Sequence, residues 1–273
     1  MMRRLTPVIL ALALTTGAGA SELPRVVSVN VCTDQLVLLL AEPEQIVSLS
    51  AIADSARSSS MADEARAFAK NNNRAESIAV QEPDVVVAGQ WSDPALVNML
   101  RSIDIEVVQF PLTASLAEIP DQIREMGRVL RQDAKAETLA LEVEAELAAR
   151  PDVHDAAPLA AFFFPNGFAL GAGTLSHDIL TAGGARNLSV DLGFAGNGRL
   201  SLEQVVLEQP DFLVGAPSYS GFSRSEEMTT HPSLEGFPMM HSSPDWVCGT
   251  PHALRAVADV AAMVEQFKGE ATQ

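Results

Sequence analysis

The side chains best suited to holding a large, flat ligand occur in short segments that follow predicted strands. Both tryptophans and the single tyrosine fall in such segments, although aromatic residues make up only 5% of the chain. Aromatic rings stack on flat ligands, and arginine pairs with carboxylate or phosphate groups. The candidate binding residues are Thr33, Arg57, Trp91, Phe164, Thr174, Tyr219, Arg224 and Trp246. Alternatively, Trp91 and Trp246 anchor their loops, and the arginines are ordinary surface residues.

The two cysteines allow three interpretations. Cys32 and Cys248 are the only ones in the chain, and in an oxidising compartment such a pair can form a disulfide. They could instead be two separately buried thiols. Cys32 could also be a thiol nucleophile served by a distant histidine, so a secreted thiol enzyme is an alternative function.

Serine-based catalysis and direct metal binding have less support. The chain contains no Gly-x-Ser-x-Gly motif, and Ser176, His177 and Asp178 are consecutive, which does not in itself make a relay triad. All five histidines lie at or beyond residue 154, whereas an interlobe zinc site needs about three ligands drawn from both halves of the chain. We therefore expect a non-enzyme with no catalytic residue, bound metal or cofactor.

The first twenty residues have the layout of a secretory signal peptide. Two arginines precede an apolar run over residues 7–14, and small residues end at Ala20. We expect cleavage between Ala20 and Ser21 and export to the periplasm; an uncleaved anchor is the alternative. Cleavage removes two arginines and no acid, so the formal charge changes from −17 to −19. Such an acidic protein is a poor partner for nucleic acid or anionic membranes.

Short apolar runs alternate with helical patterns in two regions of the chain. This alternation favours an α/β fold with mainly parallel sheets flanked by helices. A chain of 273 residues suits two domains of roughly 100 residues each. The predicted strands are 26–29, 46–49, 85–88, 106–109, 159–164, 168–170 and 212–215, and the predicted helices include 34–41, 94–102, 177–182 and 252–267.

A helical pattern with few turn signals separates the two regions. Over residues 115–150 it predicts one helix on the order of 50 Å long, which would join two lobes rigidly. The alternative is two helices broken near Gln132-Asp133. We expect an N-terminal lobe over residues 21–112, a linking helix over 113–150 and a C-terminal lobe over 151–273.

Residues 75–89 recur as residues 202–216, at an offset of 127. Each copy has a glutamate in a short helix, a Pro-Asp break and a buried strand, and Ser201 begins the second copy with capping-box spacing. Chance similarity is the alternative to a true repeat. Two lobes of the same plan would bind ligand beyond the carboxyl ends of their strands, in the cleft between them.

Taken in chain order, these motifs resemble the periplasmic binding proteins of cobalamin and ferric-siderophore ABC importers, the class with a helical spine. The resemblance covers nearly the whole mature chain and rests on residues 25–36, 76–89, the long helix, 171–187 and 202–204. It implies a monomer that captures a metal chelate and delivers it to an ABC permease and ATPase complex.

By the same resemblance, Glu76 and Glu203 would meet arginines of the membrane subunits. Alternatively, each carboxylate only stabilises the N-terminus of its own helix.

Cobalamin and hydroxamate siderophores are the expected ligands, because the cleft segments carry aromatic rings and few positive charges. Strongly anionic catecholates fit less well, since only Arg57 and Arg224 are suitably placed. Haem would need a tyrosine or histidine ligand, which Tyr219 could provide. A binding protein that serves a sensor instead of a permease is a further alternative.

Overall fold

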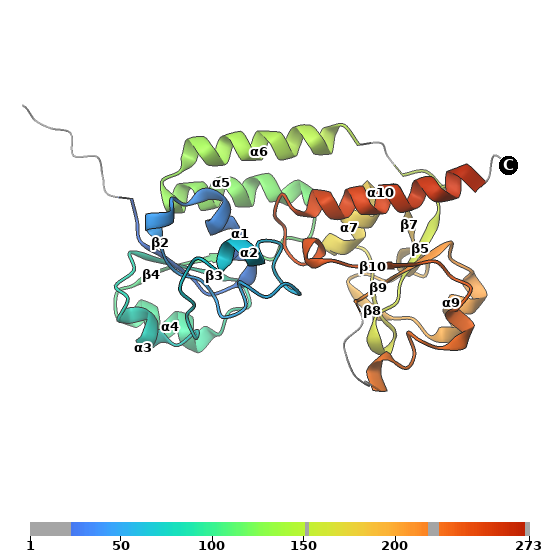
Figure 1. Ribbon diagram of the computed structural model, residues 1–273, viewed down its shortest axis with the longest axis horizontal. Coiled ribbons are helices and arrows are strands. Elements are labelled where there is room, and N and C mark those ends of the chain that lie inside the picture. The colour runs from blue at the N-terminus through green and yellow to red at the C-terminus, as the bar shows by residue number, and fades with distance from the viewer. Residues whose placement is uncertain (1–22, 151–152, 218–223, 271–273) are drawn as a thin grey trace, which may run out of the picture.

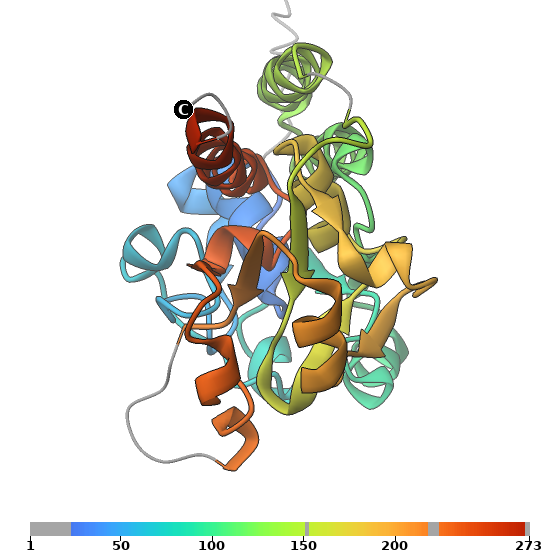
Figure 2. The same ribbon diagram turned by 90° about the vertical axis from the view of Figure 1, so that its right-hand side faces the viewer.

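The chain folds into two lobes that lie side by side beneath a layer of helices (Figure 1). The structure, a computed structural model, describes residues 23–150, 153–217 and 224–270. The expected signal peptide and Tyr219 lie outside these ranges. The helix α10 (Ala253–Glu270, red) lies above the strands of the C-lobe in both views, whereas α6 (Asp133–Ala148, light green) lies mainly above the N-lobe (Figure 1 and Figure 2).

The N-lobe contains a four-stranded sheet in the order β2-β1-β3-β4, with all neighbours parallel. Helices surround this sheet. The strand β3 is therefore buried along most of its length, as expected of a parallel strand with both faces covered. Its strands are β1 (Val26–Ser28), β2 (Ile46–Ser48), β3 (Val85–Gly89) and β4 (Glu106–Phe110), and its helices are α1 (Val31–Leu40), η1 (Pro43–Gln45), α2 (Ala62–Ala65), α3 (Ala75–Ala79) and α4 (Pro94–Ser102).

The C-lobe repeats this topology with a parallel sheet in the order β10-β9-β5-β7. The strands are β5 (Leu159–Phe162), β7 (Arg186–Asn187), β9 (Phe212–Gly215) and β10 (Met239–His241). The helices are α7 (Leu175–Ala182), α8 (Leu188–Asp191), α9 (Leu202–Glu208) and α10 (Ala253–Glu270), with short 3-10 turns η3 (Pro165–Gly167), η4 (Arg224–Glu226), η5 (Pro232–Leu234) and η6 (Pro244–Trp246). The two-lobed α/β architecture with mainly parallel sheets is thus confirmed.

The expected single linking helix is wrong. The segment contains η2 (Leu116–Glu118), α5 (Ile119–Leu130) and α6 (Asp133–Ala148), and the chain reverses between the last two, where Arg131 adopts a left-handed conformation with φ of 57°. The helices form an antiparallel hairpin, because Arg124 of α5 binds both Glu137 and Glu144 of α6.

This hairpin packs on the core instead of standing free. The residues of α5 at helical spacing, Ile119, Ile123, Met126 and Leu130, are all fully buried. They belong to a buried cluster that includes residues of both lobes, such as Val37 and Phe162. Because α5 contributes to both cores, it still joins the lobes firmly.

Two features of the C-lobe differ from the predicted strands. Residues 168–170 form β6, which leaves the main sheet and pairs antiparallel with β8 (Asn197–Arg199). The predicted strands 159–164 and 168–170 therefore meet only in a single bridge between Phe164 and Phe168. The edge strand β10 is not among the predicted strands. Its Met-Met-His sequence lacks the β-branched residues that indicate a strand.

Candidate functional site: the cleft between the lobes

A short segment of the C-lobe, residues 247–250, is held against the N-lobe by a disulfide, a hydrogen bond and close packing. Cys248 forms a disulfide with Cys32 in the first turn of α1. The Thr250 hydroxyl lies 3.3 Å from Oε1 of Gln35 and donates to it. Gly249 lies so close to Thr113 that an added Cβ would overlap that side chain. The two lobes therefore meet at the carboxyl end of β1.

An interlobe hollow of about 90 Å³ lies next to this attachment. It is formed by the segments that follow β1, β3 and β4, together with Val247 and Gly249 of the C-lobe. The N-lobe sheet therefore directs the carboxyl ends of three strands toward the other lobe, which is where parallel sheets bind ligands. The N-lobe lining residues are Asn30, Cys32, Thr33, Leu36, Gly89, Gln90, Trp91, Phe110, Pro111, Leu112, Thr113 and Gln122.

A second hollow, of about 350 Å³, also lies between the lobes. Residues between Ala56 and Glu64 form its N-lobe side, and Pro244, Asp245 and Arg255 form the other. Arg255 pairs with Asp245 through two hydrogen bonds of 2.6 and 3.0 Å, so its charge is already balanced within the C-lobe.

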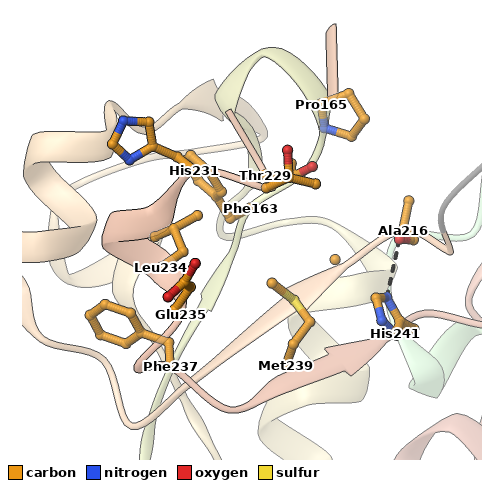
Figure 3. A pocket seen from close by; sticks show the side chains of 12 residues that line it. Phe163, Pro165, Ala216, Thr229, His231, Leu234, Glu235, Phe237, Met239 and His241 are labelled. Atoms are coloured by element: carbon orange, nitrogen blue, oxygen red, sulfur yellow. Dashed lines mark hydrogen bonds between the residues drawn. The ribbon is translucent and has the colours of Figure 1, made fainter. Parts of the chain in front are cut away.

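The carboxyl edge of the C-lobe sheet forms a third hollow, of about 340 Å³ (Figure 3). Its wall is largely apolar and aromatic, with histidines at opposite ends in the view. Such a lining suits an apolar or aromatic ligand surface. The residues are Phe163, Pro165, Gly215, Ala216, Thr229, Thr230, His231, Leu234, Glu235, Phe237, Met239 and His241.

The two histidines of this C-lobe hollow have different hydrogen-bonding states. Nδ1 of His241 lies 3.1 Å from the carbonyl oxygen of Ala216. A carbonyl only accepts, so this Nδ1 is the donor; in the neutral tautomer with the proton on Nδ1, Nε2 keeps its lone pair, which is the arrangement of a histidine that ligates a metal. Nδ1 of His231 instead accepts from the Ser233 N–H at 3.2 Å, which leaves its Nε2 as a donor.

The structure brings some of the predicted N-lobe residues to the cleft. Trp91 lines the interlobe hollow and is 79% exposed, so its ring is available for stacking. Thr33 also borders this hollow, but it is buried and its hydroxyl donates to the Asn30 carbonyl at 2.9 Å. Arg57 is exposed in the loop after β2 and lines none of the three hollows described above.

The loop that carries Arg57 is held by a buried carboxylate. Asp34 of α1 accepts hydrogen bonds from the backbone N–H and the hydroxyl of Ser50, at 3.0 and 2.5 Å. Burial raises the pKa of Asp34, while hydrogen bonds from Ser28 and Ser50 and the charge of Lys70 oppose that rise.

The predicted C-lobe residues are more scattered. Phe164 is half-buried and stacks on Phe162 with ring centroids 5.9 Å apart. Thr174 caps α7 by accepting from the His177 N–H at 3.2 Å and lines none of the three hollows. Arg224 is exposed at the start of η4.

The placement of Trp246 in the cleft is wrong. It is only 7% exposed and packs edge-on against Phe162, with centroids 5.9 Å apart. The turn that carries it packs against α10 and α7, so its apolar ring fills the C-lobe core and its neighbour Val247 reaches the hollow instead.

Glu76 and Glu203 are both exposed in the first turn of a short helix, one in each lobe. The expected capping box is present in α9, where Ser201 and Gln204 bond reciprocally. Hydrogen bonds from its own backbone N–H and from Ser201 lower the pKa of Glu203, so this carboxylate is ionised at neutral pH. An exposed, charged carboxylate in the first turn of a helix is suited to recognising arginine.

Sequence reasoning did not select His231 and His241 as site residues. The sequence gives them little weight, because all five histidines lie at or beyond residue 154, whereas an interlobe metal site needs ligands from both halves of the chain. The position of His241 depends on Ala216, which is 25 residues away in sequence and lies on the neighbouring strand end. No local pattern reveals that contact.

The disulfide also bears on catalysis. Cys32 within it presents no thiolate, which removes the nucleophile that the thiol-enzyme alternative requires.

In the described part of the chain, no group of three or more histidine, cysteine or acidic side chains could hold a metal ion. Within the same ranges, no helix combines the length and apolar character needed to cross a membrane.

Comparison with known proteins relates the chain to one family. A sequence profile described as "Periplasmic binding protein" matches residues 26–239. A cobalamin-binding protein of Halobacterium salinarum is 24% identical over 218 residues, which is 78% of this chain and 59% of that protein. The chain therefore spans under two thirds of this curated relative.

Solved structures share the fold. A periplasmic heme-binding protein, RhuT from Roseiflexus sp. RS-1, superposes with a TM-score of 0.71 at 20% identity, covering 88% of this chain and 97% of that one. The periplasmic vitamin B12 binding protein BtuF of Vibrio cholerae superposes with a TM-score of 0.65 at 15% identity, covering 90% and 98%. These relatives are binding proteins rather than enzymes.

Proposed function

The chain belongs to the periplasmic binding protein family, and from this premise we propose that it captures an intact metal chelate, cobalamin or a ferric siderophore, and delivers it to an ABC importer. Family membership itself implies a periplasmic or extracellular location. We further propose that the chain is exported through cleavage after Ala20 and acts as a monomer.

One observation carries the proposal on capture: the carboxyl ends of the parallel strands border a hollow in each lobe, and the N-lobe hollow is closed by residues of the other lobe. Three N-lobe segments, including that of Trp91, face Val247 and Gly249 across the interlobe hollow. On the C-lobe side, the wall built by Phe163, Phe237 and Met239 offers apolar surface. A large chelate that touches both lobes would be held by stacking and apolar contact, without chemical change.

A haem-like porphyrin is the second candidate ligand, and His241 is the observation that favours it. The hydrogen bond from its Nδ1 to the Ala216 carbonyl orients the ring and leaves Nε2 able to coordinate iron. The aromatic wall of the same hollow would contact the porphyrin plane. A His241→Ala variant should then lose the absorption band shift that axial ligation gives to ferric haem, whereas cobalamin or siderophore binding would not depend on this side chain in the same way.

For delivery, we propose that Glu76 and Glu203 dock the loaded protein on two arginine-bearing membrane subunits. The repeat supports this role, because it sets one ionisable side chain at the same position of each lobe. Charge-assisted pairs of this kind fix orientation and speed association.

Uptake of radiolabelled cobalamin, ferric hydroxamate or haem by cells that lack the chain tests this function. The wild-type protein should restore uptake of one ligand, and the Glu76→Ala/Glu203→Ala double variant should fail to do so although the purified variant still binds that ligand. Full uptake with the double variant removes the docking role. If the wild-type protein restores no uptake, import is wrong and a sensor role gains support.

A further inference from the structure

The aliphatic side chains of Val80 and Leu207 are unusually exposed to solvent. Among the exposed large apolar residues that the structure describes, Val80 is the most exposed at 84%, and Leu207 follows at 79%, equal to Trp91. Single exposed apolar residues are common on protein surfaces and need no explanation. Val80 and Leu207 differ from that background because the internal repeat relates them.

The two residues occupy the same position of the repeat. Each lies four residues after a proposed docking glutamate, Glu76 in one copy and Glu203 in the other. In a helix, side chains four residues apart are neighbours on one face. Each glutamate is therefore paired with an apolar side chain of its own lobe.

The inward-facing positions of these helices are already filled. Ile78 and Val205, which lie two residues before Val80 and Leu207, are both fully buried in their lobes. Val80 and Leu207 are therefore not core residues that pack poorly. An apolar side chain at either position therefore adds little to the packing of its own lobe, and it is available for contact with another molecule.

The backbone presents both pairs with the same local geometry. Two residues further on, Glu82 and Gln209 both adopt a left-handed conformation, with φ of 50° and 48°. Each precedes a proline and then β3 or β9, the equivalent strands of the two sheets. In the molecule, α3 and α9 lie on different lobes and away from the layer of α6 and α10 (Figure 1).

We propose that Val80 and Leu207 are apolar anchors that contact the membrane subunits of the importer beside Glu76 and Glu203. A partner that meets two equivalent surfaces in the same way must itself present two equivalent surfaces, which is the property of a two-fold symmetric pair of subunits. Each of those subunits would offer an arginine for the carboxylate and an apolar recess for the neighbouring side chain. This proposal rests on the delivery function.

The charged contacts and the apolar contacts would contribute differently to docking. Paired charges at the edge of an interface mainly steer association and fix register, whereas an apolar side chain buried in a recess lengthens the life of the complex. Burial of one such side chain changes affinity by about tenfold or more. Loss of Val80 and Leu207 should therefore weaken docking even when both glutamates remain.

Uptake and ligand binding measured on Val80→Ser, Leu207→Ser and the double variant test the proposal. Leu141→Ser is the matched control, because Leu141 is 52% exposed on α6, on another face of the molecule. At low chelate concentration the double variant should reduce uptake about tenfold or more. Ligand affinity of the purified variants should stay at the wild-type value, and the control should support normal uptake.

Photo-crosslinking in cells, from a benzophenone side chain at position 80 or 207, provides the second readout. Adducts from both positions should contain membrane subunits of an ABC importer, and position 141 should give none. Normal uptake with the double serine variant, or adducts only with a second copy of this chain, overturns the proposal while import and docking through the glutamates stand. If wild-type cells show no uptake, the proposed function fails and the anchors fail with it.

Discussion

Asp84 and Asp211 perform the same structural task in the two lobes. Oδ2 of Asp84 accepts the backbone N–H of Arg25 at 2.7 Å, and Oδ2 of Asp211 accepts that of Leu159 at 2.6 Å. In return, the N–H of each aspartate donates to the carbonyl of the same partner residue, at 2.9 and 2.7 Å. The Pro-Asp break of each repeat thus sets where β3 and β9 lie against the central strands β1 and β5.

This symmetry predicts matched losses of stability. Asp84→Ala and Asp211→Ala should each lower the free energy of unfolding by about 1 kcal/mol, because each removes an acceptor from a backbone N–H. The corresponding asparagine variants keep an acceptor oxygen and should lose less. Urea denaturation of the four variants checks this, and a neutral effect at one site with a clear loss at the other contradicts the structural equivalence.

The Cys32–Cys248 disulfide joins residues 216 apart in sequence, and therefore restricts the unfolded chain strongly. Cys32→Ser/Cys248→Ser should lower the free energy of unfolding by about 2–5 kcal/mol. Guanidinium denaturation of the wild-type protein with reductant should match the double variant without it. Reductant should leave the variant unchanged, and equal stability of wild type and variant would show that the bond does not form.

The half-buried ring of His252 makes stability depend on pH. Its pKa lies below the ordinary value of 6.5 because burial and the nearby Arg255 disfavour the cation, with Asp245 and Glu64 opposing them. In acid the unfolded chain takes up this proton before the folded chain does. Stability should therefore be full above the ordinary pKa and decrease as the pH falls below it.

Thermal unfolding between about pH 7.5 and about pH 5 should show a smaller decrease for His252→Gln than for the wild-type protein. His177, whose pKa burial also lowers, accounts for part of the remaining slope, so adding His177→Gln should flatten it further. An unchanged slope in the double variant is incompatible with this explanation.

The helical hairpin predicts a severe effect at Gly127. A Cβ at this position would overlap Ala136 of α6, because the two helices approach closely there. Gly127→Val should lower the free energy of unfolding by about 1–3 kcal/mol. Ala134→Val, at an exposed position of α6, is the matched control and should have little effect. A mild Gly127→Val variant would favour the single straight helix over the hairpin.

The sequence indicates the parts of the fold that local pattern determines. Val85–Ala88 and Phe212–Gly215 are continuous apolar runs, and both are buried strands. The reversal at Arg131 has no such signal, because glycine, not arginine, is the usual residue in a left-handed turn. The break therefore remained only an alternative to one long helix.

The candidate site shows the same contrast between residues that a local sequence pattern places and residues that it does not. Trp91 follows a clear strand, and its place at the hollow follows from the rule that ligands bind at the carboxyl ends of parallel strands. Trp246 follows a strand that lacks a β pattern, and only the packing of α10 and α7 decides that its ring is buried. Contacts between distant segments, such as His241 with Ala216, lie beyond any local pattern.

A fluorescence titration of the mature protein, from Ser21, tests the central claim of chelate capture most directly. Trp91 is exposed on the interlobe hollow and Trp246 is buried, so a chelate in the cleft should quench mainly Trp91. We predict saturable quenching by cobalamin, a ferric hydroxamate or haem at about micromolar concentration or below. The quenching should be largely lost in Trp91→Phe. If none of the three ligands quenches beyond the inner-filter control, chelate capture is wrong, and if Trp91→Phe is quenched as fully as the wild-type protein, the ligand does not bind in this cleft.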